Sequence, residues 1–162
     1  MATSIRKSPP VCLSISIVRL LFRKLTYSKE FITSIVKMKN SDEYKIFRHV
    51  EISDKKNIDS SVVFIVRFKF ANFSQKINVF ISQFPMLLIT GFPGFIAKVY
   101  AVNEKNGYWQ GMYQWESKQA VAEYKKSFVL KMMNKRALQN TVQYFEIEKC
   151  SIDNFIKDKL LN

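Results

Sequence analysis

Lys98 and Tyr100 are the side chains of this sequence best suited to acid–base chemistry on a bound molecule. They stand two residues apart in the apolar segment 95–102, and because side chains alternate along a strand, both are expected on one face. A group that takes a proton from a bound molecule acts best inside a pocket that excludes water. We therefore predict that Lys98 and Tyr100 are the catalytic acid or base, although neither has a paired carboxylate nearby in the sequence.

Further side chains are expected to line the same cavity and to bind the substrate. A cation would hold an anionic or phenolic group, and a methionine would supply soft packing. The predicted substrate-binding residues are Arg67, Gln110, Met112 and Gln114. The face is chosen because the alternate set in segment 95–102 is small and apolar, which suits contact with helices. The reverse assignment would place three aromatic side chains in the cavity instead, namely Trp109, Tyr113 and Trp115.

The Asn-Gly pair at 106–107 is a strong hairpin signal between the segments 95–102 and 108–116. Positions equidistant from this turn are expected to lie opposite each other. Tyr100 would then face Gln110 and Lys98 would face Met112, with about 5 Å between directly paired residues. This pairing predicts a cation, a phenol and amides in one neighbourhood.

The sequence has no recognisable metal, phosphate or nucleophile motif. His49 is the only histidine, which excludes a histidine-based metal site within one chain and favours a surface or interface role. No metal and no cofactor are expected. Cys12 and Cys150 lie far apart and form no redox motif, so we expect a reduced, cytoplasmic protein, with a mitochondrial location as the alternative.

The order of elements predicts the fold class. Six elements are expected in chain order, at 62–70 (strand), 75–89 (helix), 95–102 (strand), 108–116 (strand), 118–133 (helix) and 138–148 (strand). This is the βαββαβ order of a ferredoxin-like α+β domain, with a four-stranded antiparallel sheet and both helices on one face. The open face has to be covered. We therefore predict a homodimer in which two sheets form a dimeric α/β barrel.

Positive charge is concentrated at the front of the chain. Of the net charge of +13, residues 1–40 carry +7, from eight basic side chains and one acidic side chain. We predict three parts: a basic extension at 1–60 with an amphipathic helix at 11–25 and a short strand at 44–52, the barrel domain at 61–150, and a C-terminal helix at 151–162. The extension is expected to contact a membrane surface or act in targeting, and residues 1–40 should be dispensable for folding. No nucleic-acid motif and no membrane span are expected.

The segment 94–100 (Gly-Phe-Ile-Ala-Lys-Val-Tyr), the turn Glu-Lys-Asn at 104–106 and the segment 111–115 (Gly-Met-Tyr-Gln-Trp) form a recognisable series. Together with Ala120 and Tyr124 in the following helix, it resembles the YdhR-type monooxygenases of the antibiotic-biosynthesis-monooxygenase superfamily. The resemblance covers about residues 62–148. It implies a dimeric α/β barrel around a cavity for a small apolar or aromatic ligand. Some members oxidise polycyclic aromatics with oxygen and neither metal nor flavin, and others degrade haem.

Three functions fit these observations. The first is a small cofactor-independent oxygenase of the YdhR type. The second is a non-catalytic barrel that binds an apolar ligand or a protein. In the third, the basic N-terminal segment is primary, as a membrane-surface or organelle-targeting element on a barrel. A closed apolar pocket with several convergent polar groups would favour the oxygenase, and a filled barrel would favour the binding protein.

Overall fold

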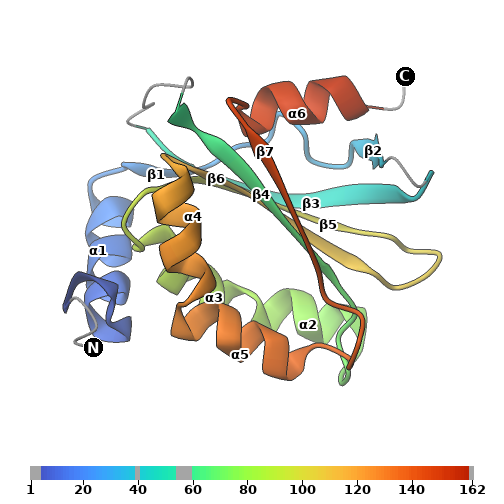
Figure 1. Ribbon diagram of the computed structural model, residues 1–162, viewed down its shortest axis with the longest axis horizontal. Coiled ribbons are helices and arrows are strands. Elements are labelled where there is room, and N and C mark those ends of the chain that lie inside the picture. Colours follow the sequence, from blue (N-terminus) through green and yellow to red (C-terminus); the bar gives the residue numbers. More distant parts are fainter. Residues whose placement is uncertain (1–4, 39–40, 54–59, 161–162) are drawn as a thin grey trace.

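One antiparallel sheet forms the centre of the molecule. A computed structural model describes residues 5–38, 41–53 and 60–160. The sheet runs in the order β1-β3-β5-β6-β4-β7, and β2 also pairs with β3 (Figure 1). The strands are β1 (Leu25–Tyr27), β2 (Ile35–Lys37), β3 (Glu43–Ile52), β4 (Val62–Phe68), β5 (Phe95–Val102), β6 (Trp109–Trp115) and β7 (Gln143–Glu148). The helices are the 3-10 helix η1 (Ile5–Lys7) and α1 (Pro9–Leu21), α2 (Gln75–Ile81), α3 (Gln83–Thr90), α4 (Lys118–Lys125), α5 (Phe128–Arg136) and α6 (Ile152–Lys159).

The predicted ferredoxin-like order is present within this sheet, from β4 through α2, α3, β5, β6, α4 and α5 to β7. Ser74 and Ser117 cap α2 and α4, because each hydroxyl accepts a hydrogen bond from the amide three residues on, at 3.5 and 3.2 Å. Each predicted helix is divided into two. The first is divided at Ser82, so that Pro85 falls in the first turn of α3, where it is tolerated. The second is divided at Ser127, whose hydroxyl caps α5.

The sheet has seven strands rather than the predicted four, because residues before β4 add three. β3 pairs with β5 from Lys45 opposite Val102 to Glu51 opposite Ala97. β1 and β2 pair with the two ends of β3. Without β3, β5 would be an edge strand with a row of unpaired backbone groups. The boundary predicted at residue 60 therefore falls between two strands of one sheet, and the part before it is no separate extension.

Helix α1 packs against α3 through small residues. Cys12 and Ser16 are buried at this contact, and a Cβ added to Gly91 would lie 1.8 Å from the Cys12 carbonyl oxygen. Only glycine permits such a close approach of two backbones. Val18 and Phe22, apolar residues of the predicted amphipathic helix, are exposed rather than packed on the protein. The helix also ends at Leu21, four residues before the predicted end.

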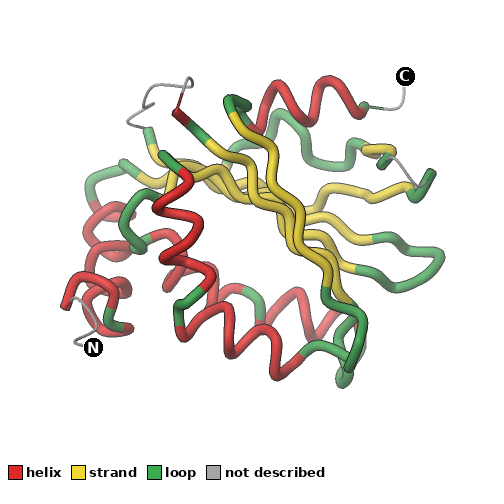
Figure 2. The backbone as a smooth tube through the Cα atoms, viewed as in Figure 1, coloured by secondary structure: helices red, strands yellow, loops and turns green. Residues whose placement is uncertain are grey.

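Both faces of the sheet are covered by the same chain. Helices α3, α4 and α5 cover one face, whereas α6 and the segment 28–38 lie on the other (Figures 1 and 2). The covering side chains on this second face are Phe31, Val36, Ile152, Phe155 and Ile156. Every residue of β5 and β6 is buried as a result. Among residues 5–38, 41–53 and 60–160, the sheet therefore has no open apolar face of the kind that was the reason for predicting a homodimer.

The hairpin between β5 and β6 has a different register from the predicted one. Val102 pairs with Trp109, so Tyr100 lies opposite Gly111 and Lys98 opposite Tyr113. The side chain of Asn103 accepts hydrogen bonds from two amides of the loop, at 2.9 and 3.1 Å, and so closes a loop of even length. A slip of one residue moves every side chain of a strand to the other face. The prediction that Lys98 faces Met112 and Tyr100 faces Gln110 is therefore wrong.

Candidate functional site

A cavity of about 50 Å³ lies between the sheet and helices α3 and α5. Its walls are almost entirely apolar or aromatic, and polar atoms enter it from only a few side chains. The floor is formed by strand residues, which include Phe68, Lys98, Tyr100, Trp109, Gly111 and Tyr113. The roof comes mainly from helix residues, which include Pro85, Ile89, Tyr124, Val129, Met132 and Met133. Lys98 and Tyr100, the two predicted catalytic residues, therefore line one cavity. The face predicted for them is wrong, because this cavity lies under α3 and α5, whereas the small apolar set at 97, 99 and 101 lies on the side of α6.

Lys98 is enclosed by aromatic rings. Its side chain is 5% exposed, and its Nζ lies 3.9 Å from the ring centre of Tyr100 and 4.3 Å from that of Tyr113. No described acidic residue forms an ion pair with it. Burial holds the pKa of Lys98 well below its ordinary value of 10.5, and the positive charge of Arg48 acts in the same direction. The amine is therefore far more easily held in its neutral, basic form than a lysine in water.

Tyr100 lies beside Lys98 on the same strand. Its hydroxyl is buried and makes no well-formed hydrogen bond within the described residues. Burial raises the pKa of Tyr100 well above its ordinary value, and nearby Tyr113 adds to this rise, whereas Arg48 opposes it. The hydroxyl stays protonated and can donate a hydrogen bond to an oxygen atom of a ligand.

Arg48 lies beside the candidate site and was not among the residues predicted for it. It extends from β3 to the junction of α2 and α3, where it donates to the Ser82 hydroxyl at 2.8 Å and to the Val79 carbonyl at 3.1 Å. Its guanidinium lies 5.1 Å from the ring centre of Tyr100. Arg48 fixes this helix junction over the cavity and supplies the positive charge beside Lys98. Only the apolar alternation within 44–52 could have indicated that this residue belongs to the sheet.

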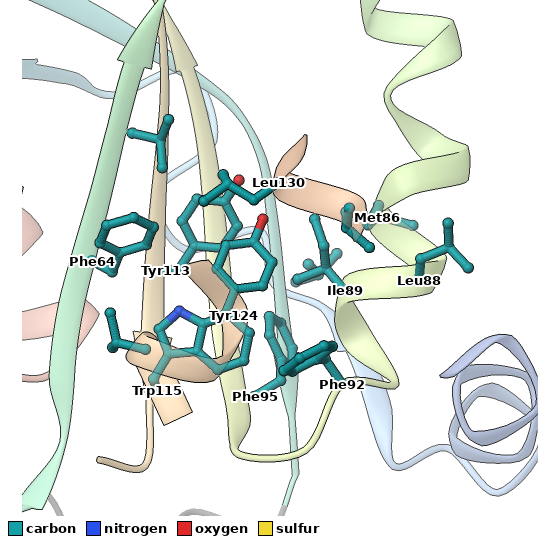
Figure 3. Close-up of a cluster of buried hydrophobic side chains, with 14 of the residues drawn as sticks. Phe64, Met86, Leu88, Ile89, Phe92, Phe95, Tyr113, Trp115, Tyr124 and Leu130 are labelled. Carbon is teal, nitrogen blue, oxygen red and sulfur yellow. The ribbon is translucent and has the colours of Figure 1, made fainter. Parts of the chain in front are cut away.

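Tyr113 and Tyr124 together close the cavity next to Lys98. The rings of Tyr113 and Tyr124 lie side by side, with 5.3 Å between their centres, and Trp115 packs below them (Figure 3). A Cβ on Gly111 would lie 2.9 Å from the Tyr113 ring, so only glycine leaves room for this ring. Burial raises the pKa of Tyr113 and of Tyr124. Tyr113 and Trp109 both line the cavity, as the alternative face assignment in the sequence expected.

The predicted substrate-binding residues do not gather around this cavity. Arg67 pairs with Asp42 and lies 4.5 Å from the ring centre of Tyr108. Met112 is fully buried in the cluster under α6. Gln114 accepts a hydrogen bond from the first amide of α6 at 3.0 Å.

Gln110 is the one member of the set beside the cavity. Its amide, however, lies 3.4 Å from the Met38 sulfur, on the opposite face. The reason for all four corrections is the register. Residues 110, 112 and 114 project to the side of the sheet that Lys98 does not share, and residue 67 of β4 pairs with residue 110.

His49 is buried rather than at the surface. Its ring contacts Phe31, with 5.9 Å between the centres, on the side of the sheet covered by α6. Neither ring nitrogen has a hydrogen-bond partner in the described part of the chain, and burial lowers the pKa of this histidine. His49 therefore cannot reach a ligand in the cavity. Within residues 5–38, 41–53 and 60–160, no three His, Cys, Asp or Glu side chains gather as a metal site would require.

The fold has solved counterparts. A ferredoxin-fold protein from Listeria monocytogenes, related to antibiotic biosynthesis monooxygenases, superposes with a TM-score of 0.53 and 11% identity, over 84% of this chain and 89% of its own. A monooxygenase-like protein from Listeria innocua gives 0.52 and 12%, over 82% and 86%. A haem-degrading enzyme from Listeria monocytogenes gives 0.51 and 15%, over 82% and 92%. No family model and no curated protein matches the sequence.

The likeness is one of fold. The aligned share exceeds the predicted 61–150 unit, so parts of the chain outside that unit also belong to the shared architecture. The ferredoxin-like part of the expected fold is confirmed, since the solved counterparts are proteins of this fold related to antibiotic-biosynthesis monooxygenases. The dimeric barrel and the YdhR type stay predictions.

Proposed function

We propose that this protein is a cofactor-independent oxygenase of the YdhR-like kind, acting on a small planar aromatic compound. One observation carries the proposal: a buried lysine with no acidic partner among the described residues lies between two tyrosine rings in an apolar cavity. A lysine of lowered pKa in such a place is suited to take a proton from a weakly acidic carbon.

The chemistry assigns a separate task to each group. The neutral amine of Lys98 removes a proton from a CH₂ group made acidic by flanking rings, and Tyr100 donates a hydrogen bond to the substrate oxygen that gains charge. The carbanion reduces O₂ and forms a peroxide, which takes the proton back from Lys98. Loss of water then leaves a carbonyl group. The balance is CH₂ plus O₂ giving C=O plus H₂O, so no external reductant is required.

The size of the cavity sets a condition on this reaction. A single water needs about 10–15 Å³ of such space, so about 50 Å³ holds a few waters or part of a ring system. A tricyclic substrate therefore requires the roof to move. Met132 and Met133 belong to that roof together with Pro85, and methionine side chains adapt readily to a new shape.

Anthrone, a tricyclic ketone with one activated CH₂ group, is the probe for this reaction. Oxygen uptake and the absorbance of the quinone product should both appear with the wild-type protein. Lys98→Met should reduce turnover by at least about 100-fold, the usual contribution of a general base. Lys118→Met removes a lysine that is paired with Glu148 at the surface and should leave turnover unchanged.

A ligand-binding protein without catalysis is the second candidate, and the buried Tyr100 and Tyr124 hydroxyls favour it. Each could bind a polar group of a ligand. Quenching of tryptophan fluorescence by anthrone, with no oxygen uptake above the buffer rate, would select this function and refute the oxygenase.

A further inference from the structure

We propose that the C-terminal end of α1 and the turn after it form a docking surface for an anionic lipid membrane. Three apolar side chains stand out from this end of the helix. Val18, Leu21 and Phe22 are 51%, 75% and 71% exposed, and they follow one another along the last turn. A soluble surface rarely presents such large apolar groups side by side unless they contact something.

The opposite side of α1 is fixed to the protein, so these side chains cannot turn inward. Ser16 donates to the Leu87 carbonyl and lies 2.8 Å from the Thr90 hydroxyl. Arg19 donates to the Thr90 carbonyl. Because these bonds anchor one face of α1 to α3, the other face is held outward.

The turn that ends α1 is equally well defined. The amide of Arg23 bonds to the Leu20 carbonyl at 3.1 Å, and the amide of Lys24 bonds to the Arg19 carbonyl at 2.7 Å. Together with the φ of 53° at Arg23, this is the αL closure that commonly ends a helix. Leu21, Phe22 and the two basic residues are thereby presented as one rigid group.

Charge selects a membrane as the occupant of this surface. Arg23 and Lys24 are exposed directly beside Leu21 and Phe22, and residues 1–40 carry a net charge of +7. Apolar side chains with adjoining basic residues are typical of elements that lie in the interface of an anionic bilayer. A second copy of the chain fits less well, because two such surfaces would bring like charges together. The described part of the chain holds no helix long and apolar enough to cross a membrane.

Sedimentation of the full chain with vesicles tests this proposal. The vesicles contain phosphatidylcholine alone or phosphatidylcholine with phosphatidylserine. We expect binding only to the vesicles with phosphatidylserine, and less of it at high salt. The double variant Leu21→Asp/Phe22→Asp should lose binding, and Arg23→Gln/Lys24→Gln should weaken it about tenfold or more.

Phe145→Asp is the matched control. Phe145 is 49% exposed on β7, at the edge of the sheet opposite β1, and its replacement should leave vesicle binding unchanged. Unfolding in urea should show that all three variants remain folded. Equal binding to both kinds of vesicle, an equal loss in the control, or no binding at all would overturn the proposal. So would a protein that avoids vesicles and self-associates through Leu21 and Phe22.

Discussion

Replacing Lys98 with methionine should stabilise the protein at neutral pH and remove part of the pH dependence of its stability. The amine is buried between two aromatic rings, and no carboxylate acts on its pKa. Methionine is unbranched and of similar length, so it can fill the same space. The variant therefore removes a desolvated amine and leaves the packing largely intact.

The sign of the effect follows from proton binding. Between the lowered pKa of the folded protein and the ordinary value of 10.5, the unfolded chain binds a proton that the folded chain does not. The free energy of unfolding therefore rises with pH in this range. At pH values below the range, the folded protein carries the full cost of burying the charged amine. Below the lowered pKa the folded chain has to bury an ammonium, which costs several kcal/mol, and the faces of Tyr100 and Tyr113 return about 0.5–2 kcal/mol each of that cost. We expect Lys98→Met to gain about 1–4 kcal/mol at neutral pH.

Urea unfolding followed by tryptophan fluorescence measures this difference. It is done at about pH 7 and about pH 9, below the range in which the buried tyrosines ionise. The difference in free energy of unfolding between Lys98→Met and wild type should be smaller at the higher pH. The surface variant Lys118→Met should have the same free energy of unfolding as wild type at both pH values. A Lys98→Met protein that is less stable than wild type by the same amount at both values would refute the reasoning, because it would mean that the lysine is stabilised as a charged group.

Three more outcomes follow from the packing. Gly111→Ala should destabilise the protein by about 1–3 kcal/mol in urea unfolding, because the new Cβ lies 2.9 Å from the Tyr113 ring, and a normal stability would show that the ring moves freely. Contrary to the expectation from the sequence, deletion of residues 1–40 should abolish soluble expression, because Cys12, Phe31 and Val36 are core residues. Burial of a Phe or Val side chain stabilises the fold by about 1.5–3 kcal/mol. Light scattering should give the 19.0 kDa mass of one chain, because both sheet faces are covered, and twice that mass would contradict this.

The sequence was sufficient for the ferredoxin-like unit because its signals are local. Residues 62–68 are mostly β-branched or aromatic, and Ser74 and Ser117 act as helix caps within three residues of themselves. The three added strands have weaker signals. β1 and β2 are three residues long each, and they form only because β3 is already in place. Local propensity does not encode such long-range pairing.

The candidate site depended on one structural detail that the sequence does not reveal. The residue types suggested Lys98 and Tyr100, and which residues lie beside them depends on whether the hairpin loop has an odd or an even number of residues. Asn103 decides this, because its side chain binds two loop amides. The predicted binding residues were consequently placed on the same side of the sheet as Lys98, whereas they project to the opposite side. Tyr113, opposite Lys98, contacts it together with Tyr100.

Helix α3 connects the cavity to the surface proposed for the membrane. Pro85 and Ile89 on this helix line the cavity. On the same helix, Leu87 and Thr90 form hydrogen bonds with Ser16 and Arg19 of α1. A movement of α3 that admits a tricyclic substrate must therefore carry α1 with it or break these bonds. Because an apolar aromatic compound concentrates in bilayers, docking of α1 would bring the roof of the cavity close to the place where such a substrate collects. The two proposals are independent in their tests, but one helix links them physically.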